Sequence, residues 1–332
     1  MLKKWWWVIP VLLIIIYLAG PSPAKPAYKT DMPVVPDNAL QLEAYVKNNE
    51  ALHKIKTDNE ARIIWFNDSS KQRTDYAIVY LHGFSASQAE GDPVHKNIAK
   101  EFGCNLYLSR LAEHGIDTID AMINLTADKY WESAKQALAI GKQLGKKVIL
   151  MSTSTGGTNA LQLAATYPDD IAALILLSPN IEINDANAWL LNNHWGLQIA
   201  HLVLKSDFID SKDDRPIYKQ YWDWHYRAEA AVALQELLET TMTKETFEKV
   251  KQPVQLLYFY KDETHQDSVV KVSAMLKMYD ELGTPDSLKR KQAMPNAGTH
   301  VIGSYIKSHD VESVQKEIEK FMSDVLHIQK IN

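Results

Sequence analysis

Short apolar runs alternate with amphipathic stretches from residue 61 to the end of the chain. The segments that read as strands cover residues 63–66, 77–81, 105–108, 148–151, 171–177, 254–260 and 288–293. Several are continuously apolar, which is typical of strands buried on both faces of a parallel sheet. Helical patterns follow at residues 93–102, 126–144, 157–166, 268–282 and 310–327. This alternation predicts an α/β fold in which helices cover both faces of a mostly parallel sheet.

One inserted segment breaks this alternation. Residues 182–250 lie between two apolar runs and contain no pattern that predicts a strand. The segment is rich in aromatic residues, namely Trp189, Trp195, Tyr218, Tyr221, Trp222, Trp224 and Tyr226. Since α/β folds place their sites at the carboxyl ends of the strands, we predict a helical cap over that edge of the sheet. The alternative is a helical excursion whose aromatic residues pack only against one another.

The first twenty residues predict an export or anchoring segment. Lys3 and Lys4 precede an unbroken apolar run over residues 5–20. A helix over this run would be about 24 Å long, a little short of a hydrocarbon core of roughly 30 Å. Lysines before the run favour a cytoplasmic amino terminus. We therefore expect an exported protein. Its catalytic domain is either anchored on the extracytoplasmic side of a membrane or, if a signal is cleaved, secreted or periplasmic.

Residues 21–36 join this segment to the rest of the chain. The stretch contains Pro21, Pro23, Pro26, Pro33 and Pro36. Such a proline density predicts an extended, semi-rigid spacer outside any packed core. The folded domain is accordingly expected to occupy residues 37–332.

Charge and cysteine content exclude several classes of function. The net charge of −5 provides no basic footprint for a nucleic acid. Cys104 is the only cysteine in the sequence. It therefore cannot form an internal disulfide or a cysteine-based zinc site.

A serine-rich turn suggests the first catalytic residue. The apolar run 148–151 leads into Ser-Thr-Ser-Thr-Gly-Gly and then into a helical pattern. This strand–turn–helix context is that of a nucleophile elbow, which holds a serine hydroxyl clear of the sheet. The positions two residues before and after must be small, and Ser152 and Gly156 meet that need. Ser154 is therefore the candidate nucleophile; the alternative is an ordinary helix-capping serine.

A second turn supplies a candidate oxyanion hole. His82, Gly83 and Phe84 directly follow the apolar run 77–81. Acyl transfer requires two backbone N–H donors, one after the nucleophile and one from a loop after an earlier strand. Thr155 and Phe84 would be these donors. A glycine after a strand is also compatible with an ordinary turn.

A serine hydroxyl needs a histidine to accept its proton and a carboxylate to orient that histidine. Asp262 follows the run 254–260, and His300 follows the run 288–293. Asp267 is a competitor for the acid, but its place before the helical pattern 268–282 predicts a capping role. We therefore predict Asp262 as the acid and His300 as the base.

With these residues in place, residues 75–325 resemble the α/β-hydrolase superfamily. The resemblance is to carboxylesterases and monoacylglycerol-lipase-like serine hydrolases in particular, and the chain order Ser–Asp–His agrees with it. It implies an eight-stranded, mostly parallel sheet with a helical cap inserted after the sixth strand. It also implies a triad of Ser154, Asp262 and His300. Ser152 departs from the family pattern, which has glycine there.

The function expected from this resemblance is a serine hydrolase that cleaves carboxylic esters through an acyl-enzyme. Short or medium acyl esters, aryl esters and monoacylglycerols are the expected substrates, and no metal or organic cofactor is needed. His82, Trp222 and Trp224 are expected to line the substrate site. The expected partners are a small-molecule ester and, through the amino-terminal segment, a membrane.

Three alternatives remain open at this point. A peptidase of the same fold would use acidic residues of the inserted segment to hold a substrate amine. The candidates for this are Asp185, Asp207, Asp210, Asp213, Asp214 and Asp223. The second alternative is an acyltransferase, and the third is a non-catalytic binding module on the same fold.

Overall fold

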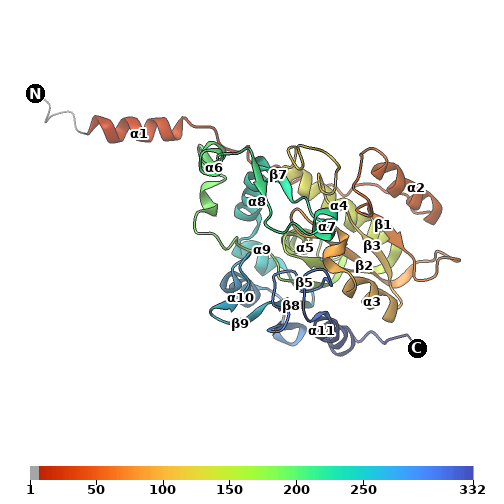
Figure 1. The fold of residues 1–332 in the computed structure, drawn as a ribbon. Helices are drawn as coiled ribbons and strands as arrows, with labels where there is room; N and C mark the ends of the chain where they lie inside the picture. Colours follow the sequence, from red (N-terminus) through yellow and green to blue (C-terminus); the bar gives the residue numbers. More distant parts are fainter. Residues whose placement is uncertain (1–6, 332) are drawn as a thin grey trace, which may run out of the picture.

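The computed structural model describes residues 7–331. Its central sheet has the strand order β1-β3-β2-β4-β5-β8-β11 within these residues (Figure 1). The strands are β1 (Arg62–Ile64), β2 (Thr74–Leu81), β3 (Asn105–Leu108), β4 (Gly145–Thr153), β5 (Ile171–Leu177), β8 (Val254–Tyr258) and β11 (Lys289–Ala293). Only β1 pairs antiparallel with its neighbour in this sheet. The predicted α/β fold with a mostly parallel sheet is confirmed.

The sheet of the described chain has seven strands and not the eight expected from the resemblance. The chain before β1 forms α2 (Ala39–Glu50), preceded by the proline-rich segment without strand structure. Proline has no backbone N–H to donate to a neighbouring strand, so this segment is poorly suited to extend the sheet. With one strand fewer, the inserted segment follows the fifth strand of the sheet in chain order and not the sixth.

Two helical layers bury the two faces of the sheet. Helices α4 (Ala127–Leu144), α5 (Thr155–Thr166) and α10 (Val272–Glu281) share one apolar core with Ala77 and Val79 of β2. On the other face, α3 (Val94–Glu101) and α11 (Val311–Asp324) share a second core with Ile78 and Tyr80. The alternation of β2 residues between the two cores follows from the two-residue period of a strand. Every central strand is thus apolar on both sides, as the sequence pattern predicts.

The inserted segment, residues 182–250, is called the cap below. Its elements are η3 (Ala188–Leu190), α6 (Gly196–Leu204), β6 (Phe208–Asp210), α7 (Pro216–Tyr221), β7 (His225–Arg227), α8 (Ala228–Thr241) and α9 (Lys244–Lys249). Strands β6 and β7 pair antiparallel, so the expectation that the cap contains no strand is wrong. Three residues per strand are too few for a recognisable alternation of apolar and polar positions.

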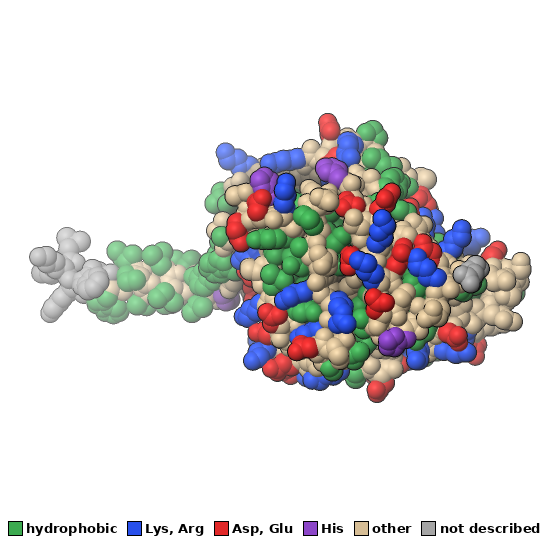
Figure 2. Space-filling view, turned by 90° about the horizontal axis from the view of Figure 1, so that it is seen from below, with side chains coloured by type: hydrophobic (Ala, Val, Ile, Leu, Met, Phe, Trp, Pro, Cys, Tyr) green, Lys and Arg blue, Asp and Glu red, His purple; other side chains and the backbone are tan. Residues whose placement is uncertain are grey.

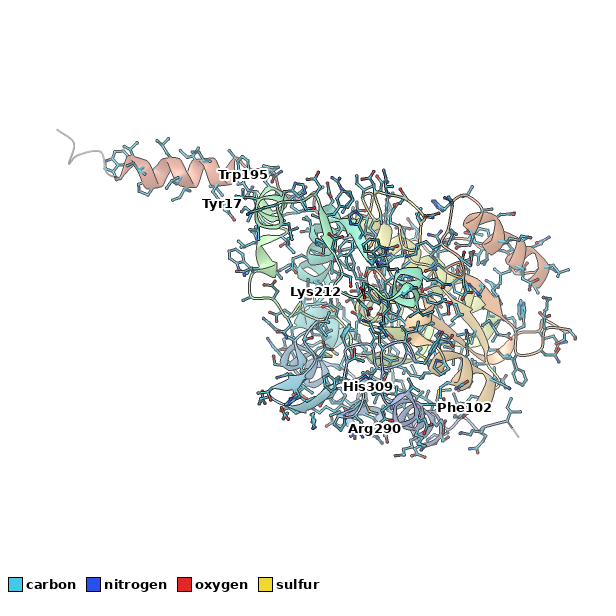
Figure 3. The ribbon with its side chains drawn as sticks, in the orientation of Figure 1. Tyr17, Phe102, Trp195, Lys212, Arg290 and His309 are labelled. Atoms are coloured by element: carbon cyan, nitrogen blue, oxygen red, sulfur yellow. The ribbon has the colours of Figure 1, made fainter. Side chains whose placement is uncertain are left out.

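Helix α1 (Val8–Leu18) projects from the body beside α6 (Figure 1). Its apolar side chains are exposed along its length, and they form the green stalk of Figure 2. At its base, the indole N–H of Trp195 donates to the backbone oxygen of Ile16, and Tyr17 and Trp195 lie close together in Figure 3. No helix within residues 7–331 has the length and apolar content to span a bilayer. Lys3 and Lys4 lie outside the described residues, and anchoring or export stays a prediction.

The proline-rich segment is extended, but it is not separate from the domain. Trp131 donates its indole N–H to the backbone oxygen of Lys29 (2.6 Å), and Lys135 donates to that of Asp31 (2.9 Å). The Tyr28 ring packs edge-on against Trp131, with ring centroids 6.3 Å apart. The expectation of a spacer outside the packed core is therefore wrong. Its backbone carbonyls accept hydrogen bonds from α4, and its few large side chains join the core.

Candidate active site

The elbow serine has the backbone geometry expected of a nucleophile. Ser154 lies between β4 and α5 with φ 52° and ψ −122°, a conformation that L-residues rarely adopt. The end of β5 holds the turn in place, because the Ser154 N–H donates to the Leu177 carbonyl (3.0 Å). The Asn180 N–H in turn donates to the Ser154 carbonyl (2.9 Å). Strained backbone of this kind persists only where the surrounding structure fixes it, as it does here.

Small residues on both sides of Ser154 make this turn possible. A Cβ atom at Gly156 would overlap the Leu81 backbone oxygen, and one at Gly157 would lie 2.6 Å from the Cβ of Pro179. Ser152, on the other side, is fully buried, and its hydroxyl is 3.5 Å from the Ile175 carbonyl oxygen. Serine in place of the family's glycine therefore leaves the turn intact.

The predicted oxyanion loop lies against the elbow. A Cβ atom at Gly83 would lie 2.8 Å from the Cβ of Ser154, so Gly83 and Ser154 are in close contact. Phe84 follows with its ring edge-on to Tyr226 of the cap and to His114, at centroid distances of 5.3 and 6.0 Å. Thr155 is fully buried and begins α5, whose amino-terminal end favours negative charge. The structure thus brings the Phe84 loop and Thr155 to the same place as Ser154.

His82 does not line the substrate site as predicted. Its side chain is fully buried; its Nδ1 lies 2.9 Å from the Gly83 carbonyl, and its Nε2 accepts the Leu111 N–H (2.9 Å). Burial holds the pKa of His82 well below its ordinary value, so the ring is neutral. With both nitrogens occupied, His82 ties the oxyanion loop to the chain that follows β3.

The carboxylate that orients His300 is Asp267. His300 donates from Nδ1 to Asp267 Oδ2 at 2.6 Å, and Asp267 is only 1% exposed. Burial by itself raises the pKa of Asp267, but the nearby His300 and the Val269 and Val270 N–H groups lower it overall. Burial lowers the pKa of His300, and the Asp267 charge outweighs this and raises it. This buried pair has the geometry of the acid and base of a triad.

The prediction of Asp262 as the acid is therefore wrong. Asp262 ends the short strand β9 (Tyr260–Asp262), which pairs with β10 (His265–Gln266) in a surface hairpin. Its exposed carboxylate accepts the Thr264 and His265 N–H groups at 2.9 Å each and contacts the His265 ring. The hairpin brings the next aspartate, Asp267, back to the edge of the sheet, where its N–H donates to the Phe259 carbonyl. Asp267 uses Oδ1 for the turn that precedes α10 and Oδ2 for His300.

The second ring nitrogen of His300 is available for chemistry. His300 is 9% exposed, and its Nε2 is buried without a hydrogen-bond partner among residues 7–331. A buried, unpaired ring nitrogen is costly unless it serves a reacting group. In a triad this is the nitrogen that accepts the serine proton.

One of the two predicted cap tryptophans packs between the loops that follow the oxyanion residues and His300. Trp222 is 4% exposed and packs with Ala86 and Ala89, beyond the oxyanion loop, and with Val301 and Ile306, beyond His300. Trp222 thus closes the space between the two loops that carry the site. The ring of Tyr218 stacks on it, with a centroid distance of 4.9 Å.

Trp224 lies on the outer side of the cap. Its side chain is 37% exposed, and the Lys219 ammonium lies 4.4 Å from the centre of its ring. It lines an open cavity together with residues 54–57 and 116–119, apart from Ser154 and His300. The prediction that Trp224 lines the substrate site is therefore not met, whereas the role of Trp222 at the site stays a prediction.

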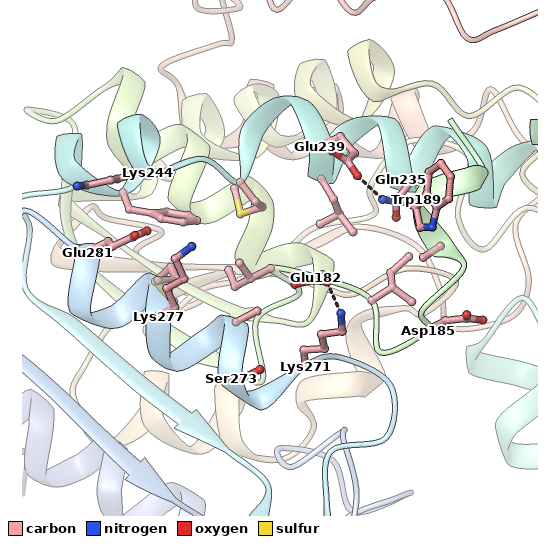
Figure 4. A pocket seen from close by; sticks show the side chains of 18 of the residues that line it. Glu182, Asp185, Trp189, Gln235, Glu239, Lys244, Lys271, Ser273, Lys277 and Glu281 are labelled. Carbon is pink, nitrogen blue, oxygen red and sulfur yellow. Dashed lines mark hydrogen bonds and ion pairs between the residues drawn. The ribbon is translucent and has the colours of Figure 1, made fainter. Parts of the chain in front are cut away.

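A separate cavity of about 480 Å³ lies between α8, α9 and α10 (Figure 4). Its wall includes Trp189, Leu238 and Phe247, and its rim includes Lys271, which pairs with Glu182. None of its lining residues belongs to the elbow, the oxyanion loop or the His300–Asp267 pair. The aromatic residues of the cap are therefore distributed over several separate sites and do not line a single pocket. Within residues 7–331, no group of three or more His, Cys, Asp or Glu side chains is arranged to hold a metal ion.

Comparisons with known proteins identify the family and the fold. The model of the family described as serine aminopeptidase, S33, matches residues 126–302. No curated protein matches the chain in sequence. A structure of the metagenome-derived lipolytic enzymes LipS and LipT is similar, with 15% identity over 81% of this chain and 99% of that one and a TM-score of 0.63.

Two monoacylglycerol-type lipases also share the fold. The lipase of Paleococcus ferrophilus has 14% identity over 79% of this chain and 98% of its own, with a TM-score of 0.58. A soluble variant of Saccharomyces cerevisiae monoglyceride lipase has 14% identity over 80% and 91%, also with a TM-score of 0.58. The family match includes Ser154, Asp267 and His300. The chain therefore belongs to the S33 serine aminopeptidase family of α/β hydrolases.

Proposed function

We propose that the protein is a serine hydrolase that cleaves carboxylic esters through an acyl-enzyme. The observation that carries this proposal is the buried Asp267–His300 pair at the same sheet edge as the strained elbow of Ser154. A serine hydroxyl becomes nucleophilic when a histidine takes its proton, and a buried carboxylate keeps that histidine in the required orientation and tautomer.

The reaction follows from these positions. His300 Nε2 takes the proton of Ser154, whose oxygen attacks the ester carbonyl, and the Phe84 and Thr155 N–H groups stabilise the resulting oxyanion. His300 then gives the proton to the departing alcohol, leaving the acyl group on Ser154. Water enters, His300 removes its proton, and a second tetrahedral intermediate releases the carboxylic acid. Asp267 stays ionised throughout and stabilises the protonated imidazole.

Two of the acidic cap residues that could hold a substrate amine are already neutralised. A peptidase that recognises a free amine needs a carboxylate that no cation already neutralises. Asp213 binds Arg215 and Lys307, at 2.7 Å each. Asp223, whose backbone N–H reaches Ser85 beside the oxyanion loop, is buried and binds Lys56 at 3.2 Å. These two acids already have cationic partners and are poor sites for a substrate amine.

The test compares ester and amide substrates on the purified protein. We expect hydrolysis of p-nitrophenyl esters with acyl chains of two to twelve carbons, and a fall of about 10³-fold or more in Ser154→Ala. Aminoacyl p-nitroanilides should be poor substrates. Faster turnover of the anilides than of the esters would make the protein a peptidase. Near-parental ester turnover in Ser154→Ala would contradict the proposed nucleophile.

Trp222 is expected to set the preference for acyl-chain length. Trp222→Ala opens space between the two site loops, so kcat/KM should shift toward longer chains. Each added methylene contributes at most about 0.8 kcal/mol, so neighbouring chain lengths should change by only a few-fold relative to one another. The matched control is Trp224→Ala, on the outer side, which should leave the profile unchanged. Equal profiles in both variants, with a large fall in melting temperature for Trp222→Ala alone, would give Trp222 a purely structural role.

A further inference from the structure

A second buried carboxyl group lies beside the candidate site and has no role in the steps above. Glu90, in the short helix η2 (Gln88–Gly91), is 2% exposed. Its Oε2 accepts the backbone N–H of Gly83 at 2.5 Å. The point where Gly83 would carry a Cβ lies 2.8 Å from both Glu90 Oε1 and the Cβ of Ser154. The Glu90 carboxyl therefore lies immediately behind the oxyanion loop, next to the nucleophile.

The groups that face Glu90 come from several elements. Tyr80 of β2, Tyr130 of α4 and Tyr218 of α7 all experience its charge, and so does His300. The loop of His300 is fastened to η2, because the Ser304 hydroxyl donates to the Ala89 carbonyl at 2.7 Å.

The charged residues next to η2 in the chain have partners of their own. Asp92 binds Lys96 at 2.9 Å, and His95 Nε2 lies 2.8 Å from the Gln88 carbonyl. Burial lowers the pKa of His95 to about 4, so that ring is neutral. Within residues 7–331, protonated His300 is the cation whose charge opposes the rise in the pKa of Glu90.

Accepting a hydrogen bond from the Gly83 N–H does not by itself require a charged side chain. Glutamine at this position could offer a carbonyl oxygen without the cost of burying an ionisable group. Burial raises the pKa of Glu90 to about 7, although the Gly83 hydrogen bond and His300 both oppose this. A carboxyl group that ionises close to His300 therefore alters the protonation of the base, which a neutral amide would not do.

We infer that Glu90 is a positioning residue for catalysis: its carboxyl fixes the His82–Gly83 peptide, directly before the oxyanion donor Phe84, and its charge holds a proton on His300. The inference rests on the proposed function for its catalytic readout. Glu90 contributes in two ways that can be tested separately. The hydrogen bond to the Gly83 N–H needs only an acceptor at this position, whereas the effect on His300 needs the negative charge.

The sign of the pH effect follows from the charges. An ionised Glu90 favours the protonated form of His300, and the protonated form cannot take the proton of Ser154. Removing the charge makes His300 lose its proton at lower pH. The acidic limb of the kcat/KM profile should therefore move to lower pH, by about half a pH unit or more, in both Glu90→Gln and Glu90→Ala.

The two variants should differ at the plateau of the profile. Glu90→Gln retains an acceptor for the Gly83 N–H, so its plateau kcat should stay within a few-fold of the parent. Glu90→Ala leaves that N–H unpaired, and kcat should fall by about tenfold or more while KM changes little. The matched control is Glu236→Gln, a buried glutamate of α8 whose carboxylate accepts an N–H of Asn192 at 3.0 Å. This control should leave the acidic limb in place.

A second measurement does not depend on turnover. The pKa of His300, followed by NMR in the inactive Ser154→Ala protein with and without Glu90→Gln, should fall when the Glu90 charge is removed. An unchanged His300 titration and an unchanged acidic limb in Glu90→Gln would overturn the inference, even if Glu90→Ala fails to fold. Absence of ester turnover in the parent, together with a shifted His300 titration, would count against the proposed function alone.

Discussion

Asp267→Asn is expected to lower kcat/KM for ester hydrolysis by about 10³-fold or more, with little change in KM. Asparagine keeps the size of the side chain but removes the charge that stabilises protonated His300. It also presents the wrong hydrogen-bonding group to Nδ1 in one of its two orientations. Because Asp267 is 1% exposed and contacts His300 at 2.6 Å, solvent cannot replace this interaction. Steady-state kinetics across pH 5–9 would measure the loss.

The matched control for this experiment is Asp262→Asn, five positions earlier. Asp262 is exposed and contacts only its own hairpin, so this variant should keep activity within about twofold of the parent. The opposite result, with Asp262→Asn inactive and Asp267→Asn active, would return the acid to Asp262. It would also mean that the pairing of His300 with Asp267 does not persist during turnover.

Gly156→Ala is expected to abolish activity and to destabilise the protein by about 2 kcal/mol or more. A methyl group at this position would overlap the backbone oxygen of Leu81, and backbone cannot move aside as a flexible side chain can. The overlap can be relieved only if α5 moves away from β2. That movement would displace the Ser154 turn and the Thr155 N–H at the start of α5. Chemical denaturation and ester turnover would measure the two losses.

Ser152→Gly is the control on the other side of the same turn. It restores the glycine of the family pattern at a fully buried position that the serine already fits, so activity should stay within a few-fold of the parent. Wild-type activity and stability in Gly156→Ala would show that the elbow does not require the close approach of α5 and β2.

The main strands and the elbow at the candidate nucleophile Ser154 were predictable because their signals are local. Continuous apolar runs mark strands buried on both faces, and the small residues around Ser154 are a steric requirement of one turn. His300 was also predictable, because it lies in the loop that follows the last strand. These features depend on neighbours within a few residues, which a single sequence displays.

The acid could not be predicted in the same way. The apolar run 254–260 looks like one strand, but β8 ends at Tyr258 and a short hairpin follows. That hairpin carries Asp262 to the surface and returns the chain at Asp267. Which of the two aspartates pairs with His300 depends on this hairpin, and no periodic pattern in the sequence predicts the hairpin.

Glu90 and the proline-rich segment were missed for a related reason. Glu90 belongs to a short 3₁₀ turn, and only the folded chain brings its carboxyl to the Gly83 N–H. Proline content predicts an extended conformation, but packing depends on where Trp131 and Lys135 of α4 offer donors to that backbone. Such contacts span about a hundred residues in sequence and are invisible to local patterns.

The most direct test of the account is covalent labelling with a fluorophosphonate, read by intact mass and peptide mapping. This reagent phosphonylates a serine only when a neighbouring base makes that serine nucleophilic. We expect one adduct per chain, located on Ser154, absent in Ser154→Ala and formed at least a hundredfold more slowly in His300→Ala. A folded parent that takes up no label, or one that is labelled at another residue, would contradict the assignment of Ser154 and His300 as nucleophile and base.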